Sequence, residues 1–452
     1  MNFTKPAALY RALLQCRRAL IPALSRAVYR GLAVLLFMTA SASGQLANSP
    51  WPDYGGGYAN QHRSAFAGSS DSAQILWAFD LATISTGFPT RGHHQPILLP
   101  DGGIVVNTME SGNGQIVAIN PNGTLRWFND EHALGPWLAA DANKIYTIIN
   151  SNGAANSDRL LSISFNGSID WHVSLPGTYP TQNGPAIGRN GAVYAADDFS
   201  SLVAITPAGA ITWTSEASGY YVNPAIASDG TIVIGGSALT AISTAGVTQW
   251  QVPTRTVSGV VASYLSPAIA DDGTIYAGQV NVSNLVAVTP AGAQIWARPD
   301  LGGAPAIGPN GTVYVVPETG ILSALNPIDG STLWTYPTGK TDYYNAEGVT
   351  VDANGNLYVS NEDGILISLT SSGQLRWSLD LAPDNSGFIG LSAPVIGSNG
   401  VLYVAGGNTG RVFAISVPEP ATVPLLLSAA ISIMAIARYS RSRIATKSSL
   451  RK

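Results

Sequence analysis

Few side chains in this 452-residue chain have the types and spacing that catalysis requires. The five histidines lie in the first half of the chain, and no pair has the His-Glu-x-x-His spacing of a metalloprotease. No Gly-x-Ser-x-Gly elbow, Walker loop or dinucleotide-binding glycine pattern is present. Cys16 is the single cysteine, which excludes disulfides, Cys-based zinc sites and a cysteine nucleophile from the rest of the chain. We therefore predict no catalytic residue and no metal ligand, and we expect that the chain is not an enzyme.

Aspartates in predicted turns are the pattern closest to a cation site. The run from Asp352 to Asn356 is similar to part of a calcium loop, but it lacks the glutamate at position twelve of an EF-hand loop. Asp229 and the pair Asp271-Asp272 occupy equivalent places in other repeats. Asp-Gly and Asn-Gly pairs supply the positive φ that tight hairpins need, so turn formation explains these residues without a cation. Calcium stays an alternative, and no cofactor is predicted.

The tryptophans mark a repeat that must position any site. Eight of the ten recur about every 43 residues, which is the length of a β-propeller blade. Each repeat combines an apolar strand, a turn and a second strand, as in 266–277, with a strand pair that reaches the tryptophan, as in 202–213. This predicts four short antiparallel strands per repeat, with the tryptophan at the end of the outermost strand and wedged against the next blade. The structural tryptophans are Trp77, Trp127, Trp171, Trp213, Trp250, Trp296, Trp334 and Trp377.

The two ends of the repeat series complete each other. Residues 74–80 form a tryptophan strand with no unit before it, and the last unit, 394–415, stops before its tryptophan. Joining the two would complete the last blade, close the ring and remove an open sheet edge. The sequence thus predicts an all-β, eight-bladed β-propeller of four-stranded antiparallel blades over 74–416, and a monomer. Seven blades plus a stray unit is the alternative.

Aromatic residues recur in the loops that lead from each tryptophan strand to the next inner strand. Seven of the eight loops contain one, and these loops should open on one face of the ring. Aromatic rings beside polar groups commonly mark binding sites and suit the stacking of sugars. The alternative is that these aromatics pack the blade tops together. The candidate ligand-binding residues are Phe88, Trp137, Tyr179, Tyr220, Tyr221, Tyr264, Tyr343, Tyr344, Phe388, Arg91, Arg255 and Lys340, with Asn183, Asn223 and Asn345 nearby.

Residues 1–44 have the form of a secretory signal peptide. They carry six basic and no acidic side chains, an apolar run from Gly31 to Ala40 and a stretch of small residues. An uncleaved anchor is the alternative, and Arg17-Arg18 leaves twin-arginine export open. Residues 1–44 and 418–452 hold twelve of the 23 basic residues but one of the 27 acidic ones, so 45–417 has a net charge of −15. Such a body would repel phosphate backbones, and no nucleic-acid partner is expected.

The C-terminal end has three parts in a fixed order. Pro418-Glu419-Pro420 precedes an uncharged run, 421–437, and a basic tail, 438–452. The run is just long enough for a transmembrane helix, and the basic tail favours a cytoplasmic end. This end resembles the PEP-CTERM sorting signal of Gram-negative bacteria, which an exosortase recognises. The resemblance implies export across the inner membrane, processing, and a cell-surface or extracellular-matrix destination, while an ordinary single-span anchor is the alternative.

The repeat resembles the propeller repeat of pyrroloquinoline-quinone (PQQ) dehydrogenases and their non-enzymatic relatives. Residues 322–334 are the closest copy, 51–64 resemble the start of that superfamily's domain, and the resemblance spans 51–416. In the enzymes it implies a quinone on a tryptophan platform, beside a calcium held by carboxylates and amides, with an aspartate base. Only Trp137 is placed for such a platform, and the acidic residues do not cluster in the family's pattern. PQQ is therefore not predicted.

Together these features predict four regions: signal peptide 1–44, an initial segment 45–73, the propeller 74–416 and a sorting signal 417–452. We expect an exported, non-catalytic binding or scaffold module whose partner is a polysaccharide or an envelope protein. A quinoprotein-like dehydrogenase or other carbohydrate-active enzyme is one alternative. A scaffold in outer-membrane protein assembly is another, although the propeller lipoprotein of that process needs a lipidated cysteine, and Cys16 precedes the apolar run.

Overall fold

A computed structural model describes most of the chain between residues 45 and 416. The described residues are 45–68, 72–84, 94–108, 114–131, 133–150, 158–176, 183–197, 201–217, 219, 222–258, 260–339, 348–381, 390–406 and 410–416. The predicted signal peptide, the Pro418–Pro420 motif, the apolar run and the basic tail lie outside them. Within these ranges no helix is long and apolar enough to cross a membrane.

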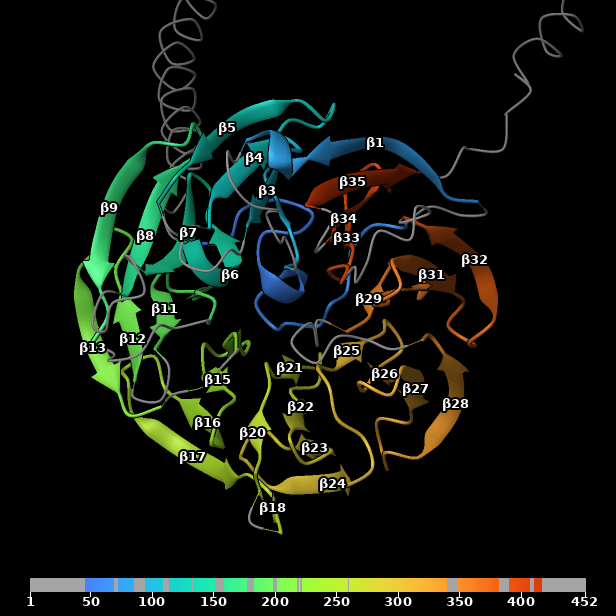
Figure 1. The fold of residues 1–452 in the computed structure, drawn as a ribbon. Helices are drawn as coiled ribbons and strands as arrows, with labels where there is room; N and C mark the ends of the chain where they lie inside the picture. Colours follow the sequence, from blue (N-terminus) through green and yellow to red (C-terminus); the bar gives the residue numbers. More distant parts are fainter. Residues whose placement is uncertain are drawn as a thin grey trace, which may run out of the picture.

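The strands form eight antiparallel blades arranged in a ring around one axis (Figure 1). The prediction of an eight-bladed, all-β propeller is confirmed, and the seven-bladed alternative is wrong. Each blade begins with a two-residue or longer strand at the axis and ends with the tryptophan strand at the rim.

The elements are numbered along the chain, and each blade is given from its innermost to its outermost strand. Blades 1 to 4 comprise β2 (Ile97–Leu98), β3 (Ile104–Asn107), β4 (Ile116–Ile119) and β5 (Leu125–Asn129); β6 (Ala133–Ala140), β7 (Lys144–Asn150), β8 (Asp158–Ser164) and β9 (Ile169–Ser174); β10 (Ala186–Ile187), β11 (Val193–Ala196), β12 (Leu202–Ile205) and β13 (Ile211–Ser215); and β14 (Ala225–Ile226), β15 (Ile232–Ile234), β16 (Ala238–Ile242) and β17 (Thr248–Pro253).

The second half of the ring follows the same order. Blades 5 to 8 comprise β21 (Ala268–Ile269), β22 (Ile275–Val280), β23 (Asn284–Val288) and β24 (Gln294–Arg298); β25 (Ala306–Ile307), β26 (Val313–Val315), β27 (Ile321–Leu325) and β28 (Thr332–Pro337); β29 (Thr350–Val351), β30 (Leu357–Ser360), β31 (Ile365–Leu369) and β32 (Leu375–Asp380); and β33 (Val395–Ile396), β34 (Leu402–Gly406), β35 (Arg411–Ser416) and β1 (Gln74–Asp80). Outside this scheme lie the 3-10 turns η1 (Tyr54–Gly56) and η2 (Leu81–Thr83), the hairpin β18 (Thr256–Val257) and β19 (Val260–Val261), and β20 (Ser263–Tyr264), which pairs with β22.

Blade 8 joins the two ends of the propeller. β1 pairs antiparallel with β35, from Gln74 opposite Ser416 to Asp80 opposite Arg411. The fourth strand of this blade therefore comes from the start of the repeat series and the other three from its end. This pairing leaves no unpaired blade edge at the seam.

The core consists of eight clusters of buried apolar residues, and each cluster contains residues from two neighbouring blades. The inner three strands are almost wholly buried, as in β12, because both faces of each blade are covered by its neighbours. The outermost strands consist mostly of exposed and half-buried residues, as in β17, and Ile211 of β13 is 47% exposed. Burial between blades is thus the main apolar contribution to stability.

The repeat tryptophans connect each blade to the next one. Seven of the eight donate a hydrogen bond from Nε1 to a backbone carbonyl in the turn between the third and fourth strands of the following blade. The pairs are Trp77 with Pro121 (3.1 Å), Trp127 with Phe165 (2.8 Å), Trp171 with Pro207 (3.0 Å), Trp213 with Thr244 (2.9 Å), Trp250 with Pro290 (2.8 Å), Trp296 with Pro327 (2.9 Å) and Trp334 with Ser371 (3.1 Å). The predicted wedge between blades is therefore present.

The same turn supplies a glycine that the indole ring covers. At Gly246, with φ of 82°, a Cβ atom would lie 2.7 Å from the Trp213 ring, so a side chain at this turn would collide with the tryptophan of the preceding blade. The third strand of the tryptophan's own blade also leaves space for the indole ring. A small residue faces each tryptophan, as Ala204 faces Trp213, and a β-bulge follows that pair. The tryptophans thus lie within the outermost strands rather than at their ends, which corrects the sequence-based expectation.

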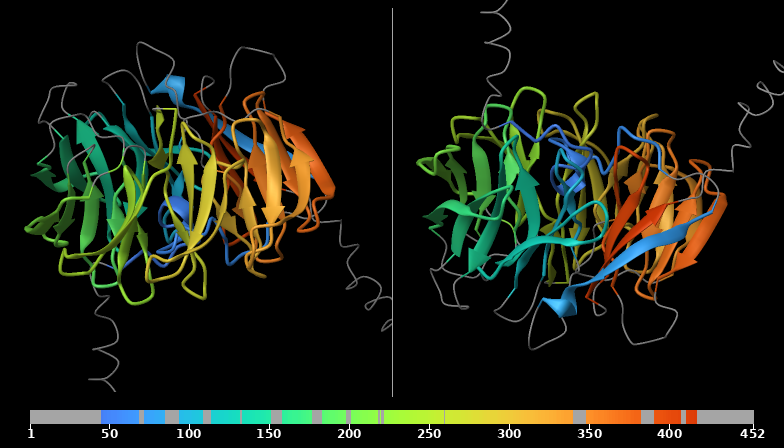
Figure 2. Two further views of the ribbon diagram at one scale, coloured as in Figure 1. Left: turned by 90° about the horizontal axis from the view of Figure 1, so that it is seen from below. Right: turned by 90° about the horizontal axis from the view of Figure 1, so that it is seen from above.

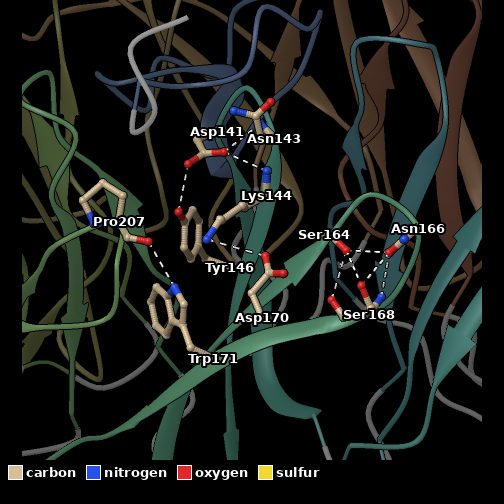
Figure 3. A network of polar contacts seen from close by, with 10 residues as sticks. All are labelled: Asp141, Asn143, Lys144, Tyr146, Ser164, Asn166, Ser168, Asp170, Trp171 and Pro207. Atoms are coloured by element: carbon tan, nitrogen blue, oxygen red, sulfur yellow. Dashed lines mark hydrogen bonds and ion pairs between the residues drawn. The ribbon is translucent and has the colours of Figure 1, made fainter.

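Figure 3 shows how these contacts combine in blade 2. Tyr146 of β7 lies against Trp171 of β9 with ring centroids 5.9 Å apart, and its hydroxyl donates to Asp141 Oδ2 at 2.8 Å. Asp141 Oδ1 accepts hydrogen bonds from the backbone of Asn143 and Lys144. The turn aspartate thus links the first hairpin of the blade to the tyrosine that supports the tryptophan.

We expect Trp213→Ala to lower the free energy of unfolding by about 3–5 kcal/mol, since it removes a large ring from between two blades. Urea denaturation followed by circular dichroism measures this loss. Val247→Ala is the control: Val247 lies in the adjoining turn, is 63% exposed, and should change stability by about 0.5 kcal/mol or less. Equal effects of the two substitutions would contradict the assigned role of the tryptophan.

Candidate functional site

Residues Trp51–Phe66, here called the axial segment, lie inside the ring (Figures 1 and 2). Their backbone carbonyls accept hydrogen bonds from the innermost strands of six blades. These bonds run from Leu98 to Trp51 (2.7 Å), Ala140 to Pro52 (2.8 Å), Ile226 to Tyr58 (2.5 Å), Ile269 to Ala59 (2.9 Å), Ile307 to Gln61 (2.9 Å) and Val351 to His62 (2.8 Å). The chain therefore fills the axis of its own ring with its own backbone.

Polar and charged side chains fasten the axial segment to the first-hairpin turns of two blades. Arg63 Nη2 lies 2.8 and 3.0 Å from the two carboxylate oxygens of Asp271, and Gln61 Nε2 donates to the same carboxylate at 2.9 Å. The guanidinium of Arg189 lies 4.4 Å from the centre of the Tyr58 ring, a cation–π contact. Because blades 3 and 5 are held through these residues, the segment is fixed at its sides as well as by its backbone.

The local sequence suits this path because two bends in it need glycine. Gly55 has φ of 73°, and a Cβ atom there would lie 2.5 Å from Asn60 Cα. Gly56 has φ of 79°, and a Cβ atom would lie 3.2 Å from the Trp51 ring. Asn60 and His62 also have positive φ, at 49° and 51°, which costs energy in residues that carry a side chain. The surrounding blades hold the segment in this conformation.

A buried polar cluster, here called the axial cluster, consists of Asp53, Tyr54, His62, Trp137 and Asn223. Tyr54 packs edge-on against His62 at 4.7 Å and against Trp137 at 5.2 Å between ring centroids. Asp53, His62 and Asn223 are 5%, 2% and 1% exposed. Among the described residues, Asp53 Oδ1, His62 Nδ1 and both polar side-chain atoms of Asn223 have no hydrogen-bond partner.

Burial keeps the ionisable members of the axial cluster uncharged. Desolvation raises the pKa of Asp53 to about 8, although a hydrogen bond from the Gly57 backbone opposes the shift. Desolvation also lowers the pKa of His62 to about 3. Near neutral pH the carboxyl group is therefore mostly protonated and the imidazole neutral. The cluster supports the axial segment as an uncharged polar core and offers no ionised base to an outside substrate.

The structure describes three of the twelve ring residues predicted from the sequence. Trp137 is 4% exposed and belongs to the axial cluster. Tyr264 is 1% exposed, and its hydroxyl donates to the Pro253 carbonyl at 3.3 Å, so it packs within blades 4 and 5, as the packing alternative expects. Arg255 is exposed beside β18. The others lie outside the described residues, namely Phe88, Tyr179, Tyr220, Tyr221, Tyr343, Tyr344, Phe388, Arg91 and Lys340.

The nearby asparagines have structural contacts. Asn183 is fully buried, donates to the Gly219 carbonyl at 2.7 Å and accepts a hydrogen bond from the Val222 backbone at 2.9 Å. The backbone N–H of Asn223 donates a hydrogen bond to the hydroxyl of Ser266, which precedes the first strand of the next blade, at 2.8 Å. These residues therefore connect the tops of neighbouring blades.

Asp352 is the candidate calcium ligand, and both of its carboxylate oxygens accept hydrogen bonds from other residues of the chain. Oδ1 accepts from the backbone of Asn354 and Asn356, and Oδ2 accepts from the Asn356 side chain, the Tyr358 hydroxyl and the Gly68 backbone, all within 3.1 Å. The aspartate thus stabilises its own turn and also holds the backbone of Gly68, just after the axial segment. In the part of the chain that the structure describes, no three His, Cys, Asp or Glu side chains come together to hold a metal.

Trp137 is the residue that could serve as a quinone platform, and its surroundings do not fit that role. A stacked cofactor needs an open ring face, whereas the Trp137 side chain is 4% exposed and lies between Tyr54 and His94. Tyr54 belongs to the axial segment, so the chain itself occupies the space beside the indole. We derive no reaction step through a quinone.

Comparison with known proteins supports the fold and a family. The family model described as outer membrane protein assembly factor BamB matches residues 156–300 and 282–419, together more than half of the chain. BamB from Moraxella catarrhalis is 17% identical, with a TM-score of 0.59, and the alignment covers 76% of this chain and 100% of that one. No curated protein matches the chain.

Two enzymes of known structure share the fold at a similarly low sequence identity. The quinohemoprotein alcohol dehydrogenase from Comamonas testosteroni is 14% identical, with a TM-score of 0.64 and coverage of 86% of this chain and 83% of that one. The quinohemoprotein alcohol dehydrogenase from Pseudomonas putida HK5 is 15% identical, with a TM-score of 0.61 and coverage of 84% and 82%. At such identities the likeness concerns the fold alone.

The axial cluster predicts a pH effect that Asp53→Asn should remove. Because the folded state raises the pKa of Asp53 from 3.8 to about 8, it holds this proton more tightly than the unfolded state does. The resulting stability is complete below pH 3.8 and is lost as the pH rises through 8. Relative to Asp53→Asn, the free energy of unfolding of the wild type should fall across this window by at most about 1.4 kcal/mol per pH unit.

Urea denaturation of both proteins between pH 4 and 9 measures the difference. His62 is present in both, so the stability that its lowered pKa removes below pH 6.5 cancels. Parallel pH profiles would show that Asp53 titrates as it does in water, and that it is not buried at the axis.

Proposed function

The chain belongs to the family described as outer membrane protein assembly factor BamB, and from that premise we propose that it is a non-catalytic binding or scaffold propeller of the cell envelope. It is exported across the inner membrane and reaches the cell surface or the extracellular matrix. The basic and apolar N-terminal residues and the Pro-Glu-Pro end support this route, with the export machinery and an exosortase-type protease as its processing partners. The apolar run 421–437 holds it in the membrane before processing.

The observation that carries the proposal is the occupied axis. Six inner strands hydrogen-bond to the axial segment, and the ionisable groups beside it are buried and uncharged. A reaction needs an accessible base or cofactor, and in the described residues the axis offers protein instead. Binding would then take place on the outer surfaces of the ring, where loops of different blades lie close together.

The charge of the body limits the partner. Residues 45–417 have a net charge of −15, which favours neutral polysaccharides or basic patches of envelope proteins over acidic polymers. The sequence places further aromatic residues in the loops between blades, such as Tyr221 and Tyr344, and this proposal assigns the stacking of sugars to them. A protein partner would make the chain an envelope scaffold, as the family's description suggests.

A second candidate function is a quinone-dependent dehydrogenase, which the likeness of the fold to two quinohemoprotein alcohol dehydrogenases favours. This candidate requires the axial segment to move away from Trp137. The two candidates therefore differ in whether the purified chain takes up a quinone.

We expect the full chain, incubated with PQQ and Ca²⁺ and then desalted, to retain no quinone. Absorbance of the bound cofactor and a dye-linked assay of alcohol oxidation measure this. Retention of one quinone per chain together with calcium, and oxidation of an alcohol, would overturn the scaffold proposal and favour the dehydrogenase.

We also expect the full chain to bind neutral glycans on an array, and Tyr221→Ala, Tyr344→Ala and the double variant to lose that binding without loss of thermal stability. Tyr264→Phe is the matched control, because Tyr264 is buried and the substitution keeps its ring. Full glycan binding by all three variants would show that these aromatics are not the binding surface.

A further inference from the structure

Four buried polar atoms of the axial cluster indicate a further component of the axis. Asp53 Oδ1, His62 Nδ1 and both polar side-chain atoms of Asn223 have no hydrogen-bond partner among the described residues, although these side chains are 5% exposed or less. Folded proteins leave few buried polar atoms without a partner, because the loss of hydration is then uncompensated. Since four such atoms belong to one cluster, a shared partner outside the polypeptide would satisfy them together.

Ring contacts place Asn223 and His62 on the two sides of one aromatic pair. Tyr54 packs against the His62 ring at 4.7 Å and against the Trp137 ring at 5.2 Å between ring centroids. A Cβ atom on Gly184 would lie 2.0 Å from Asn223 Oδ1 and 2.8 Å from Trp137 Cβ, so the Asn223 amide lies beside the indole. The two unpartnered side chains therefore belong to the same part of the axis.

The backbone of the axial segment brings Asp53 to this place as well. The Gly57 N–H bonds to the Asp53 carboxyl group, and the Gly57 carbonyl accepts from the Asn60 N–H at 3.0 Å. Asn60 Nδ2 in turn donates to the Asn223 carbonyl at 3.3 Å. Asn60 and His62 both have positive φ, so the tight turn between Asp53 and His62 is held in a strained conformation by its surroundings.

The four atoms require both a donor and an acceptor, and water provides both. The protonated Asp53 carboxyl group and Asn223 Nδ2 can each donate to a water oxygen. The neutral His62 ring accepts at Nδ1 when its proton is on Nε2, and Asn223 Oδ1 also accepts. A buried water commonly makes two to four hydrogen bonds to such atoms. A cation would leave Asn223 Nδ2 without an acceptor, and an anion would leave the two acceptors without a donor.

We propose that the axis contains ordered water that bridges Asp53, His62 and Asn223. Asp53 and His62 belong to the axial segment, whereas Asn223 directly precedes the first strand of blade 4, β14. The water would therefore join the axial segment to blade 4, in addition to the backbone bond from Ile226 to Tyr58. This inference goes beyond the proposed scaffold function, because it concerns how the closed axis is held together.

Relaxation dispersion of water ¹⁷O nuclei tests the proposal in the full chain, because it counts water molecules held inside a protein for longer than its tumbling time. We expect Asn223→Leu and Asp53→Leu each to lower this count, since leucine has a similar size but offers no hydrogen bond. Asn183→Leu is the matched control: Asn183 is equally buried, but it bonds to the backbone of Gly219 and Val222, so the count should stay unchanged.

A crystal structure of the unaltered chain keeps the result independent of how well the variants fold. We expect ordered water within hydrogen-bonding distance of at least two of the three side chains. A water count that neither leucine substitution lowers would overturn the proposal. Density for a metal ion or an organic molecule, or side chains bonded directly to one another with no water between them, would also overturn it. These outcomes are independent of whether the outer surfaces bind a glycan.

Discussion

The contact between each indole and the turn of the next blade is the interaction on which this propeller depends. One ring fills the space between two blades, covers a glycine at positive φ and donates to a carbonyl beside it, as Trp213 does with Gly246 and Thr244. A blade alone leaves both faces exposed, so apolar burial requires a neighbour on each side. The repeated contact fixes the spacing between blades, and the spacing decides how wide the axis is and what can occupy it.

The axis that results is filled by the axial segment, which precedes the first strand of the propeller. The axial segment bonds to six blades, and it carries an uncharged carboxyl group and an uncharged imidazole into the centre. This arrangement ties the N-terminal end to nearly the whole ring, while β1 ties it to the last blade. The ring is thus closed twice by the same end of the chain, once at the axis and once at the rim, which suits a rigid platform for binding.

The sequence predicts what repeats and misses what occurs once. Trp spacing, turn glycines and Asn-Gly or Asp-Gly pairs recur in every blade, so the blade number could be predicted from their agreement. The axial segment has no second copy, and nothing in its residues shows that Asp53 and His62 would be desolvated. Tyr264 has the sequence surroundings of a surface loop, yet β20 pairs with β22 and buries it. Burial of this kind depends on strand pairing between residues distant from the turn, which local sequence does not encode.

Amide hydrogen exchange of the axial segment tests the central claim most directly. The N–H groups of Asn60, His62 and Ser64 are bonded to Gly57, Gly55 and Val351 inside the ring. The account predicts that they exchange as slowly as amides of the inner strands, because opening them requires the blades to separate. Exchange as fast as that of exposed turns would show that the segment leaves the axis readily, and it would contradict a propeller whose centre is closed by its own chain.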